Sequence, residues 1–264
     1  MGRKIVIIGG GNLGSSIAEG LLKSNFCEAS DIILTKRNIS TLQRFQDRGV
    51  EVSNDNYASA SRADLVILAV KPFQVKEVLE QVAPAIRPAT ILVSVVTGVY
   101  ISDLTSVMTA ASPVFRAMPN TAIAIQESMT CLAYNNAKPE DIQYVQDIFS
   151  TLGKVVTIEE KLMDAATVLG ACGTAYAMRY IRANIQGGIE IGFDASTASL
   201  IAAQTVKGAA ELLLQKGTHP EYEIDKVTTP KGCTIAGLNE MEHQGFSSSL
   251  IKGLVASYEK IVHT

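Results

Sequence analysis

Tryptophan is absent from this chain of 264 residues, and histidine and cysteine are scarce, with three and four copies. The cysteines are widely scattered, without a C-x-x-C pair: Cys27, Cys131, Cys172 and Cys233. We expect reduced thiols, because disulfide frameworks belong to patterned cysteines in oxidising compartments. The histidines have no metal-ligand spacing with one another or with the cysteines, which argues against a zinc site. A G-x-S-x-G turn is also missing, so a Ser–His–Asp hydrolase is disfavoured and we expect the chemistry to come from a bound cofactor.

The sequence also lacks an excess of basic residues and a long apolar run. Its formal net charge is −3, which argues against a nucleic-acid binder that neutralises phosphates. The longest strongly apolar stretches, such as 90–101, fall short of the roughly 20 residues of a membrane helix. Residues 1–4 lead directly into a strand-like run, without a signal-peptide pattern. We therefore expect a soluble, cytoplasmic protein, and 47% hydrophobic residues suffice for a large core in one or two domains.

Residues 1–157 alternate short β-branched runs with helical patterns. The expected strands are 4–9, 31–35, 51–52, 64–70, 90–95, 113–117, 129–134 and 154–157. The expected helices are 15–24, 41–48, 73–82, 101–108 and 139–151. Continuous apolar runs such as the fourth of these strands are typical of strands buried on both faces. The alternation predicts an α/β fold with a doubly wound, mostly parallel sheet, whose ligand binds at the carboxyl ends of the strands.

A glycine-rich turn follows the first expected strand at once. Gly9, Gly11 and Gly14 have the G-x-G-x-x-G spacing, with Asn12 and Leu13 between the last two. The first glycine permits the tight turn, the second lets the backbone approach a pyrophosphate, and the third allows close helix–strand packing. Free amides at the start of the helix then face the phosphates. The spacing predicts a Rossmann-type dinucleotide site, and an ordinary glycine-rich turn is the alternative.

The end of the second expected strand indicates which dinucleotide binds. NAD-specific sites carry an acidic residue there, about 20 residues beyond the glycines, to bind the ribose 2′-hydroxyl. This chain has Thr35, Lys36 and Arg37 instead. Arg37 can hydrogen-bond a 2′-phosphate through its bidentate guanidinium, and Lys36 can add a point charge. NADP(H) is therefore favoured over NAD(H), although two basic residues in a solvated loop would look the same.

From residue 158 onward the pattern is helical. One face of an expected helix over 172–192 is apolar: Met178, Ile181, Ile185 and Ile189. A second helix is expected over 196–214, and small residues crowd both. We expect a dinucleotide-binding domain over 1–157 and an all-helical domain over 158–264. A helical half of this size has little core of its own, so we expect it to share helices with another subunit; a monomeric lid is the alternative.

One loop of the helical half has the composition of an anion pocket. Residues 228–234 read Thr-Thr-Pro-Lys-Gly-Cys-Thr and precede a helical run over 235–243. Hydroxyls, a glycine and a helix N-terminus together suit a substrate carboxylate, and Lys231 adds positive charge. An ordinary N-capped helix fits the same residues equally well.

The same loop, extended to Val-Thr-Thr-Pro-Lys-Gly-Cys-Thr-Ile-Ala-Gly-Leu over 227–238, resembles the signature of the pyrroline-5-carboxylate reductase family. Four other segments resemble that family, in the same order along the chain: the glycine turn 9–14, Ala-Val-Lys-Pro at 69–72, Arg-Ala-Met-Pro-Asn-Thr at 116–121, and 163–176, which is similar to the family's linker into its dimerisation domain. The resemblance implies NAD(P)H-dependent reduction of the C=N bond of 1-pyrroline-5-carboxylate to L-proline, the last step of proline biosynthesis. A cyclic imine takes a proton readily and its carbon accepts hydride directly, so such an enzyme mainly orients two ligands.

The resemblance also implies roles for individual residues. It places Thr234 and the amides of Gly232 and Cys233 on the substrate carboxylate, with Thr229 in the same pocket. Near the cofactor, NADPH with NADH as the second choice, it places Asn56, Ala69, Val70, Lys71, Pro72, Met118 and Asn120. It gives no obligatory general acid, and Thr174 is a candidate only through its position at a helix start. A homodimer through the helical half is implied, and some family members assemble five dimers into a decamer.

The chain departs from the family pattern near the expected substrate. Lys231 stands where the family usually has glycine, Cys233 stands where threonine or alanine is commoner, and 170–176 reads Gly-Ala-Cys-Gly-Thr-Ala-Tyr instead of Ser-Gly-Ser-Gly-Pro-Ala-Tyr. Two alternatives stay open: a reductase of another cyclic imine, and an NADPH-binding sensor without catalysis. A deazaflavin-dependent NADP oxidoreductase would share the first domain but not the helical half.

Overall fold

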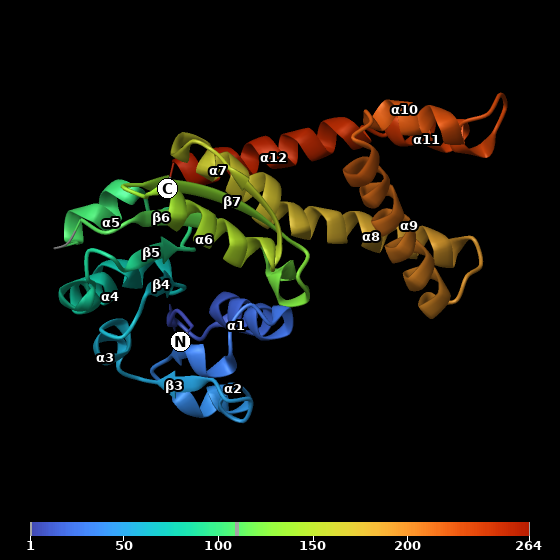
Figure 1. Ribbon diagram of the computed structural model, residues 1–264. Helices are drawn as coiled ribbons and strands as arrows, with labels where there is room; N and C mark the ends of the chain where they lie inside the picture. The colour runs from blue at the N-terminus through green and yellow to red at the C-terminus, as the bar shows by residue number, and fades with distance from the viewer. Residues whose placement is uncertain (1, 109–110, 264) are drawn as a thin grey trace. The chain divides into compact units, whose positions relative to one another are not determined.

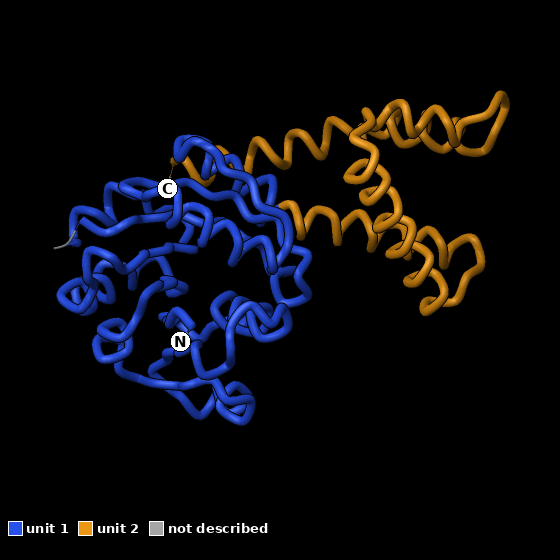
Figure 2. The backbone as a smooth tube through the Cα atoms, in the orientation of Figure 1, with its two compact units in different colours: residues 1–172 blue, residues 173–264 orange. Residues whose placement is uncertain are grey.

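The computed structural model describes residues 2–108 and 111–263. The chain divides into two compact units, the first ending at Cys172 and the second beginning at Gly173 (Figures 1 and 2). A β-sheet with helices forms the first unit, and helices alone form the described part of the second. In the ranges that the structure describes, no helix combines the length and the apolar character needed to span a membrane.

Over the described residues, eight strands form one sheet in the first unit. They are β1 (Ile5–Ile8), β2 (Ile32–Thr35), β3 (Glu51–Ser53), β4 (Leu65–Leu68), β5 (Ile91–Ser94), β6 (Val114–Met118), β7 (Ser128–Asn135) and β8 (Gly153–Thr157). Their order is β3-β2-β1-β4-β5-β6-β7-β8, and all neighbours are parallel except β6 and β7. The predicted Rossmann-type, mostly parallel sheet is confirmed, and every expected strand overlaps one of these strands.

Alternate residues of the central strands enter two separate cores. In β1, Ile5 and Ile7 belong to one core cluster and Val6 and Ile8 to the other, and all four are at most 1% exposed. Successive side chains of a strand point to opposite faces. A strand that is apolar throughout therefore requires cover on both faces, which the crossover helices supply.

Helices cover both faces of the sheet (Figure 1). They are α1 (Asn12–Ser24), α2 (Gln43–Gln46), α3 (Asn56–Ala60), α4 (Val75–Val82), α5 (Ile101–Val107), α6 (Pro139–Ser150) and α7 (Met163–Ala166). Ile17 of α1 and Phe149 of α6 belong to one core, and Val78 of α4 and Leu104 of α5 belong to the other. Five of these helices, α1, α2, α4, α5 and α6, were thus predicted, whereas the short α3, which connects β3 and β4, and α7 were not.

The segment after β8 packs with the first unit. Met163 is fully buried and Val168 is 3% exposed, and the π-helix that continues α7, Thr167–Cys172, contacts β6 and β7. Because of these contacts, the first compact unit extends to Cys172, whereas we expected the domain boundary between residues 157 and 158. The end of strand character in the sequence therefore precedes the end of the packed unit.

The second unit consists of α8 (Gly173–Glu190), α9 (Ala195–Lys216), α10 (Pro220–Val227), α11 (Cys233–His243) and α12 (Phe246–Val262). α8 packs against α9, and a Cβ on Gly188 would lie 3.2 Å from the Cβ of Ala198, so small residues allow this close approach. The three helices expected in this half overlap α8, α9 and α11. α10 and α12 were not predicted from the sequence.

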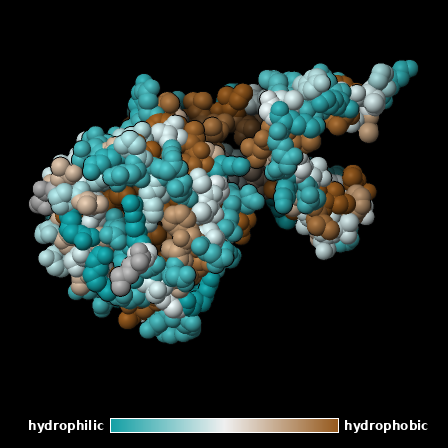
Figure 3. Space-filling model, viewed as in Figure 1, coloured by the Kyte–Doolittle hydropathy of each residue, from teal (hydrophilic) through white to brown (hydrophobic). Residues whose placement is uncertain are grey.

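Little of the second unit is buried. Among its described residues, only Ala198 and Ala202 fall in the buried class. Four large apolar side chains, spaced three or four apart on α12, are exposed: Ile251, Val255, Tyr258 and Val262. Brown, hydrophobic side chains are visible over part of this unit in Figure 3, whereas α10 and α11 are mostly teal and white there. Exposed apolar surface of this extent marks a site of association.

Candidate functional site

The three glycines after β1 have three different surroundings. Gly9 has a φ of +113°, and a Cβ there would overlap the carbonyl oxygen of Ala69, so the turn requires glycine. A Cβ on Gly14 would overlap the carbonyl oxygen of Gly9. Gly11, in contrast, has no atom within 4 Å of the place of such a Cβ. Two glycines therefore hold the turn against the sheet, and the third leaves open space in front of the backbone, which fits a pyrophosphate.

The N-terminus of α1 lies beside this open space. Its N-cap, Gly11, has no capping side chain, and the first helical hydrogen bond runs from the Ser15 amide to the Gly11 carbonyl at 2.9 Å. The amides of Asn12, Leu13 and Gly14 precede that bond and have no acceptor within the helix. Uncapped amides and the helix dipole together attract phosphate. The residues present thus fit the phosphates of a dinucleotide.

A cleft of about 570 Å³ extends from the turn beside α1. Its lining combines the turn, one side of α1, the segment after β2 and one residue of the 3-10 helix after β6: Gly10, Gly11, Asn12, Ser15, Ser16, Glu19, Lys23, Lys36, Thr41, Arg44 and Ala124. The amides of Gly9 and Gly10 both donate to the Thr35 carbonyl, at 3.1 and 2.7 Å, which fixes the turn against the end of β2. Sequence reasoning missed Thr41 and Arg44, because only the folded chain brings their segment to the cleft.

Polar side chains connect the end of β2 with α3 and α4. The buried Thr35 hydroxyl donates to Asn56 Oδ1 at 2.6 Å, and Asn56 Nδ2 donates to Gln81 Oε1 at 3.2 Å. Arg37 has another partner on α4, since its Nη2 lies 3.8 Å from Glu77 Oε1. In folds of this type the adenosine ribose lies at the end of the second strand. The structure therefore separates the two predicted cations: Lys36 lines the cleft and Arg37 reaches toward α4.

The other residues assigned to the cofactor end a strand, follow a strand or begin a helix beside one: Asn56, Ala69, Val70, Lys71, Pro72, Met118 and Asn120. The Ala69 amide donates to the Ile8 carbonyl at 2.8 Å, which joins the ends of β4 and β1. Asn120 Nδ2 donates to the Gly170 carbonyl at 3.3 Å and so joins the end of β6 to the π-helix. Because β1, β4 and β6 run in one direction, these residues share the carboxyl edge of the sheet with the glycine turn.

A buried ion cluster on β6 was not predicted from the sequence, in which Arg116 opens the segment Arg-Ala-Met-Pro-Asn-Thr without an assigned role. Arg116 is 1% exposed; its Nη1 donates to Glu160 Oε1 at 3.1 Å and its Nη2 lies 3.7 Å from Asp164 Oδ1. The guanidinium lies 4.7 Å from the ring centroid of Tyr100. The Tyr100 hydroxyl donates to Asp164 Oδ2 at 2.7 Å, and this hydrogen bond raises the pKa of Tyr100. The cluster joins β6, the start of α5 and the segment leading to the π-helix.

The loop before α11 folds into a tight turn. Lys231 has a φ of +62°, the left-handed conformation that favours glycine. The Gly232 amide donates to the Thr229 carbonyl at 2.8 Å, so this amide is already engaged. α11 begins at Cys233, which leaves the amides of Cys233 and Thr234 without an acceptor in the helix. The predicted substrate residues are thus brought into one turn, but the amides that suit a carboxylate lie one position further along than expected.

Thr174 lies at the start of α8, directly after the π-helix, and is half-buried. π-helical turns are frequent at functional sites, and no sequence signal indicated this one. The catalytic role of Thr174 stays a prediction.

Burial raises the pKa of the Cys27 thiol to about 11 and also raises the pKa of the Cys131 thiol, so neither thiol ionises readily as a nucleophile.

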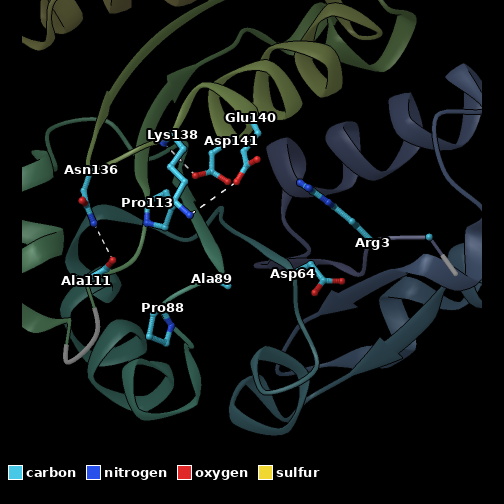
Figure 4. Close-up of a pocket in the computed structure, with 11 residues that line it drawn as sticks. Arg3, Asp64, Pro88, Ala89, Ala111, Pro113, Asn136, Lys138, Glu140 and Asp141 are labelled. Atoms are coloured by element: carbon cyan, nitrogen blue, oxygen red, sulfur yellow. Dashed lines mark hydrogen bonds and ion pairs between the residues drawn. The ribbon is translucent and has the colours of Figure 1, made fainter.

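A second cavity, of about 580 Å³, lies at the opposite edge of the sheet (Figure 4). Residues that precede β1, β4, β5 and β6 line it, together with the start of α6: Arg3, Asp64, Ala89, Pro113, Lys138, Glu140 and Asp141. Ligands of doubly wound sheets bind at the carboxyl ends of the strands. The candidate site is therefore the edge with the glycine turn, where the uncapped helix also lies.

Comparisons with known proteins match both units. A family model described as pyrroline-5-carboxylate reductase dimerisation matches residues 160–263. Another, described as NADP oxidoreductase, coenzyme F420-dependent, matches residues 4–98. Pyrroline-5-carboxylate reductase 1 of Dictyostelium discoideum is 46% identical over 97% of this chain, and the match spans 49% of that protein, so this chain spans about half its length. Pyrroline-5-carboxylate reductase 2 of the same organism is 43% identical over 98% of this chain and 92% of its own.

Solved structures that are similar to this chain include members of the same family of reductases. A pyrroline carboxylate reductase of Plasmodium falciparum with NADP bound has a TM-score of 0.89 at 26% identity, over 98% of this chain and 97% of that one. A pyrroline-5-carboxylate reductase of Coxiella burnetii has a TM-score of 0.90 at 28% identity, over 99% and 98%. The similarity therefore includes the arrangement of the elements as well as the sequence.

Proposed function

The chain belongs to the pyrroline-5-carboxylate reductase family, and we propose that it reduces 1-pyrroline-5-carboxylate to L-proline with NADPH. The observation that carries this proposal is a relative of that name that is 43% identical over 98% of this chain and 92% of its own length. The open space over Gly11 and the uncapped amides of α1 support the cofactor. This chain also has the helical half that a reductase with the first domain alone would lack.

In this proposal the chain binds and orients two ligands. NADPH, when bound, supplies the hydride. The amides of Asn12, Leu13 and Gly14 hold the pyrophosphate, and Arg37 holds the 2′-phosphate. On the substrate side, the amides of Cys233 and Thr234 and the Thr234 hydroxyl hold the carboxylate. Correct positioning removes several kcal/mol from a barrier, which suits a site for which we assign no general acid.

The proposal is tested by oxidation of NADPH with freshly prepared DL-1-pyrroline-5-carboxylate, beside NADH, a blank without imine and the six-membered homologue of the substrate. We expect rapid oxidation that depends on the five-membered imine, faster with NADPH, with a product that co-elutes with proline. Faster turnover of the six-membered imine would identify that imine as the substrate instead. Tight NADPH binding without turnover of either imine would contradict an enzymatic function and support an NADPH sensor.

Arg37→Asp is expected to weaken NADPH binding by at least about tenfold while NADH binding stays equal or improves. The change removes a charge-assisted hydrogen bond, a contact worth about 1.5–3 kcal/mol, and sets a carboxylate against the 2′-phosphate. Titration of the intact protein with each cofactor measures both constants. Arg44→Asp is the control for a cation in the cleft. Equal losses for both cofactors with Arg37→Asp would place the 2′-phosphate elsewhere, and a selective loss with Arg44→Asp would place it in the cleft.

Thr234→Ala is expected to raise the KM for the imine about tenfold or more, with little change in the KM for NADPH. The substitution removes a hydroxyl that donates to the carboxylate and leaves the backbone amides in place. Thr234→Ser keeps the hydroxyl and should restore the KM for the imine. Steady-state kinetics with each substrate varied in turn give both constants. An unchanged KM for the imine would move the carboxylate pocket away from the start of α11.

Another cyclic imine remains the second candidate, and one observation favours it. Lys231 holds a left-handed conformation that costs a non-glycine residue about 1–2 kcal/mol. Despite this conformational cost, the proposed substrate loop has a lysine at this position, which adds a positive charge that the family's usual glycine lacks. A substrate with a further acidic group would make use of that charge.

The quaternary structure that we propose is a homodimer formed by the second unit. Its support is the exposed apolar stripe of α12 and the family model for dimerisation over residues 160–263. Burial of such surface is the main driving force of obligate association. A decamer of five dimers is the larger assembly that this family allows, and sedimentation of the purified protein distinguishes the two.

The proposed compartment is the cytoplasm. Its support is the state of the cysteines, since Cys27, Cys131, Cys172 and Cys233 are all free thiols. Unpaired cysteines are typical of proteins kept in reducing compartments.

A further inference from the structure

Arg37 and Glu77 join the two elements that border the expected place of the adenosine ribose. Arg37 lies in the turn after β2 and Glu77 on α4, with Nη2 and Oε1 3.8 Å apart. One turn further along α4, Gln81 accepts from Asn56, which in turn accepts from Thr35 at the end of β2. Positions four apart lie on the same face of a helix. The same face of α4 therefore provides a neutral contact to the strand end and an acidic contact to Arg37.

We propose that Glu77 is a specificity-determining residue that moderates the preference of this chain for NADPH over NADH. The inference rests on the proposed function, in which Arg37 receives the 2′-phosphate. Glu77 and the 2′-phosphate are alternative anionic partners of one guanidinium. NADPH has to displace the Glu77 carboxylate from Arg37, whereas NADH leaves the ion pair intact.

Charge and exposure set the size and sign of this effect. A phosphate monoester carries a charge of about −1.5 to −2 and offers a bidentate contact, so it outcompetes one carboxylate. The Arg37 and Glu77 side chains are 82% and 76% exposed, and exposed ion pairs of this kind are weak. Glu77 also repels a phosphate bound next to it, which acts in the same direction. Loss of the carboxylate should therefore strengthen NADPH binding modestly and leave NADH binding almost unchanged.

The test measures dissociation constants of NADPH and NADH by cofactor fluorescence, with the intact protein and no imine. Glu77→Gln is expected to tighten NADPH binding about two- to fivefold, the range that a weak exposed ion pair gives, with NADH within a factor of about 1.5. Glu80→Gln is the matched control, because Glu80 is exposed on the same helix and has no ion pair within the described residues. In an Arg37→Gln background, Glu77→Gln should lose most of its effect, because only the direct repulsion between Glu77 and the phosphate is left.

Three results would overturn the proposal: equal tightening for both cofactors, the same tightening with Glu80→Gln, or a full effect that persists without Arg37. The expected difference should also shrink at high salt, because both charges are exposed. Binding is measured without substrate, so a failure to reduce the imine leaves this test intact and counts against the proposed function alone. A protein that binds neither cofactor would contradict both.

Discussion

Replacing Gly14 with alanine is expected to lower the free energy of unfolding by about 3 kcal/mol and to abolish measurable NADPH binding. The added Cβ would overlap the carbonyl oxygen of Gly9, and neither atom can rotate away, because both are fixed to the backbone. Overpacking of this kind typically costs about 1–3 kcal/mol, and contact with backbone belongs to the upper end of that range. Relief requires α1 to move from the turn, which also displaces the amides that face the phosphates. Urea unfolding followed by circular dichroism and NADPH titration measure the two effects.

Gly11→Ala is the matched control, because it changes a glycine of the same turn without a clash. Gly11 has a φ of −82°, and no atom lies within 4 Å of the place of its Cβ. Stability should be unchanged or slightly higher, since alanine restricts the unfolded chain. NADPH binding should weaken at least about tenfold, because the methyl group enters the space proposed for the pyrophosphate. Unaltered NADPH binding by Gly11→Ala would contradict that place, and wild-type stability of Gly14→Ala would show that the overlap is easily relieved.

The sheet could be predicted from the sequence because its signal is local. A strand buried on both faces is a continuous apolar run, and β1 and β4 are such runs bounded by polar residues or glycine. The glycine turn could be predicted for a related reason. The positive φ of Gly9 and the contact between Gly14 and the Gly9 carbonyl both belong to the strand–turn–helix backbone, which the spacing already specifies. The contact of Gly9 with Ala69, which follows β4, depends on the folded sheet.

Features that depend on distant partners could not be predicted. Arg37 pairs with Glu77, and Arg44 lines the cleft. Both placements depend on how helices approach the strand ends. The engaged amide of Gly232 depends on a turn that its left-handed neighbour Lys231 permits, and neighbouring composition does not specify that turn. α12 was not predicted although its apolar stripe is regular. No loop motif marked its start within a helical half that is rich in small residues.

The carboxyl edge of the sheet and the start of α11 share one structural feature, an uncapped helix N-terminus. In both, a helix begins at a glycine N-cap without a capping side chain, so its first amides have no acceptor of their own. One such terminus suits phosphates and the other suits a carboxylate. In the proposed mode of binding, backbone amides hold both ligands, so few titratable side chains are needed.

Arg116→Met is expected to lower the free energy of unfolding by about 3 kcal/mol or more. The variant keeps much of the side-chain volume but leaves the Asp164 carboxylate, whose side chain is 11% exposed, without its cation. Removal of one partner of a buried ion pair typically costs about 3–5 kcal/mol, because the remaining charge stays desolvated. The loss should appear as a lower urea midpoint for the first unit. Arg62→Met is the control, since Arg62 forms an exposed pair with Glu51 and its loss should cost less than about 1 kcal/mol.

Asp164→Asn added to Arg116→Met separates charge from packing. If the stranded carboxylate causes the loss, the double variant should recover part of the stability, because residues in one network couple by about 0.5–3 kcal/mol. The Tyr100 hydroxyl bonds one oxygen of Asp164, and asparagine can keep that contact through its side-chain oxygen. A double variant no more stable than Arg116→Met would assign the loss to packing around β6. Equal losses for Arg116→Met and Arg62→Met would show that burial of the guanidinium adds nothing, so that the join between β6 and the segment leading to the π-helix depends on apolar contacts such as those of Met163.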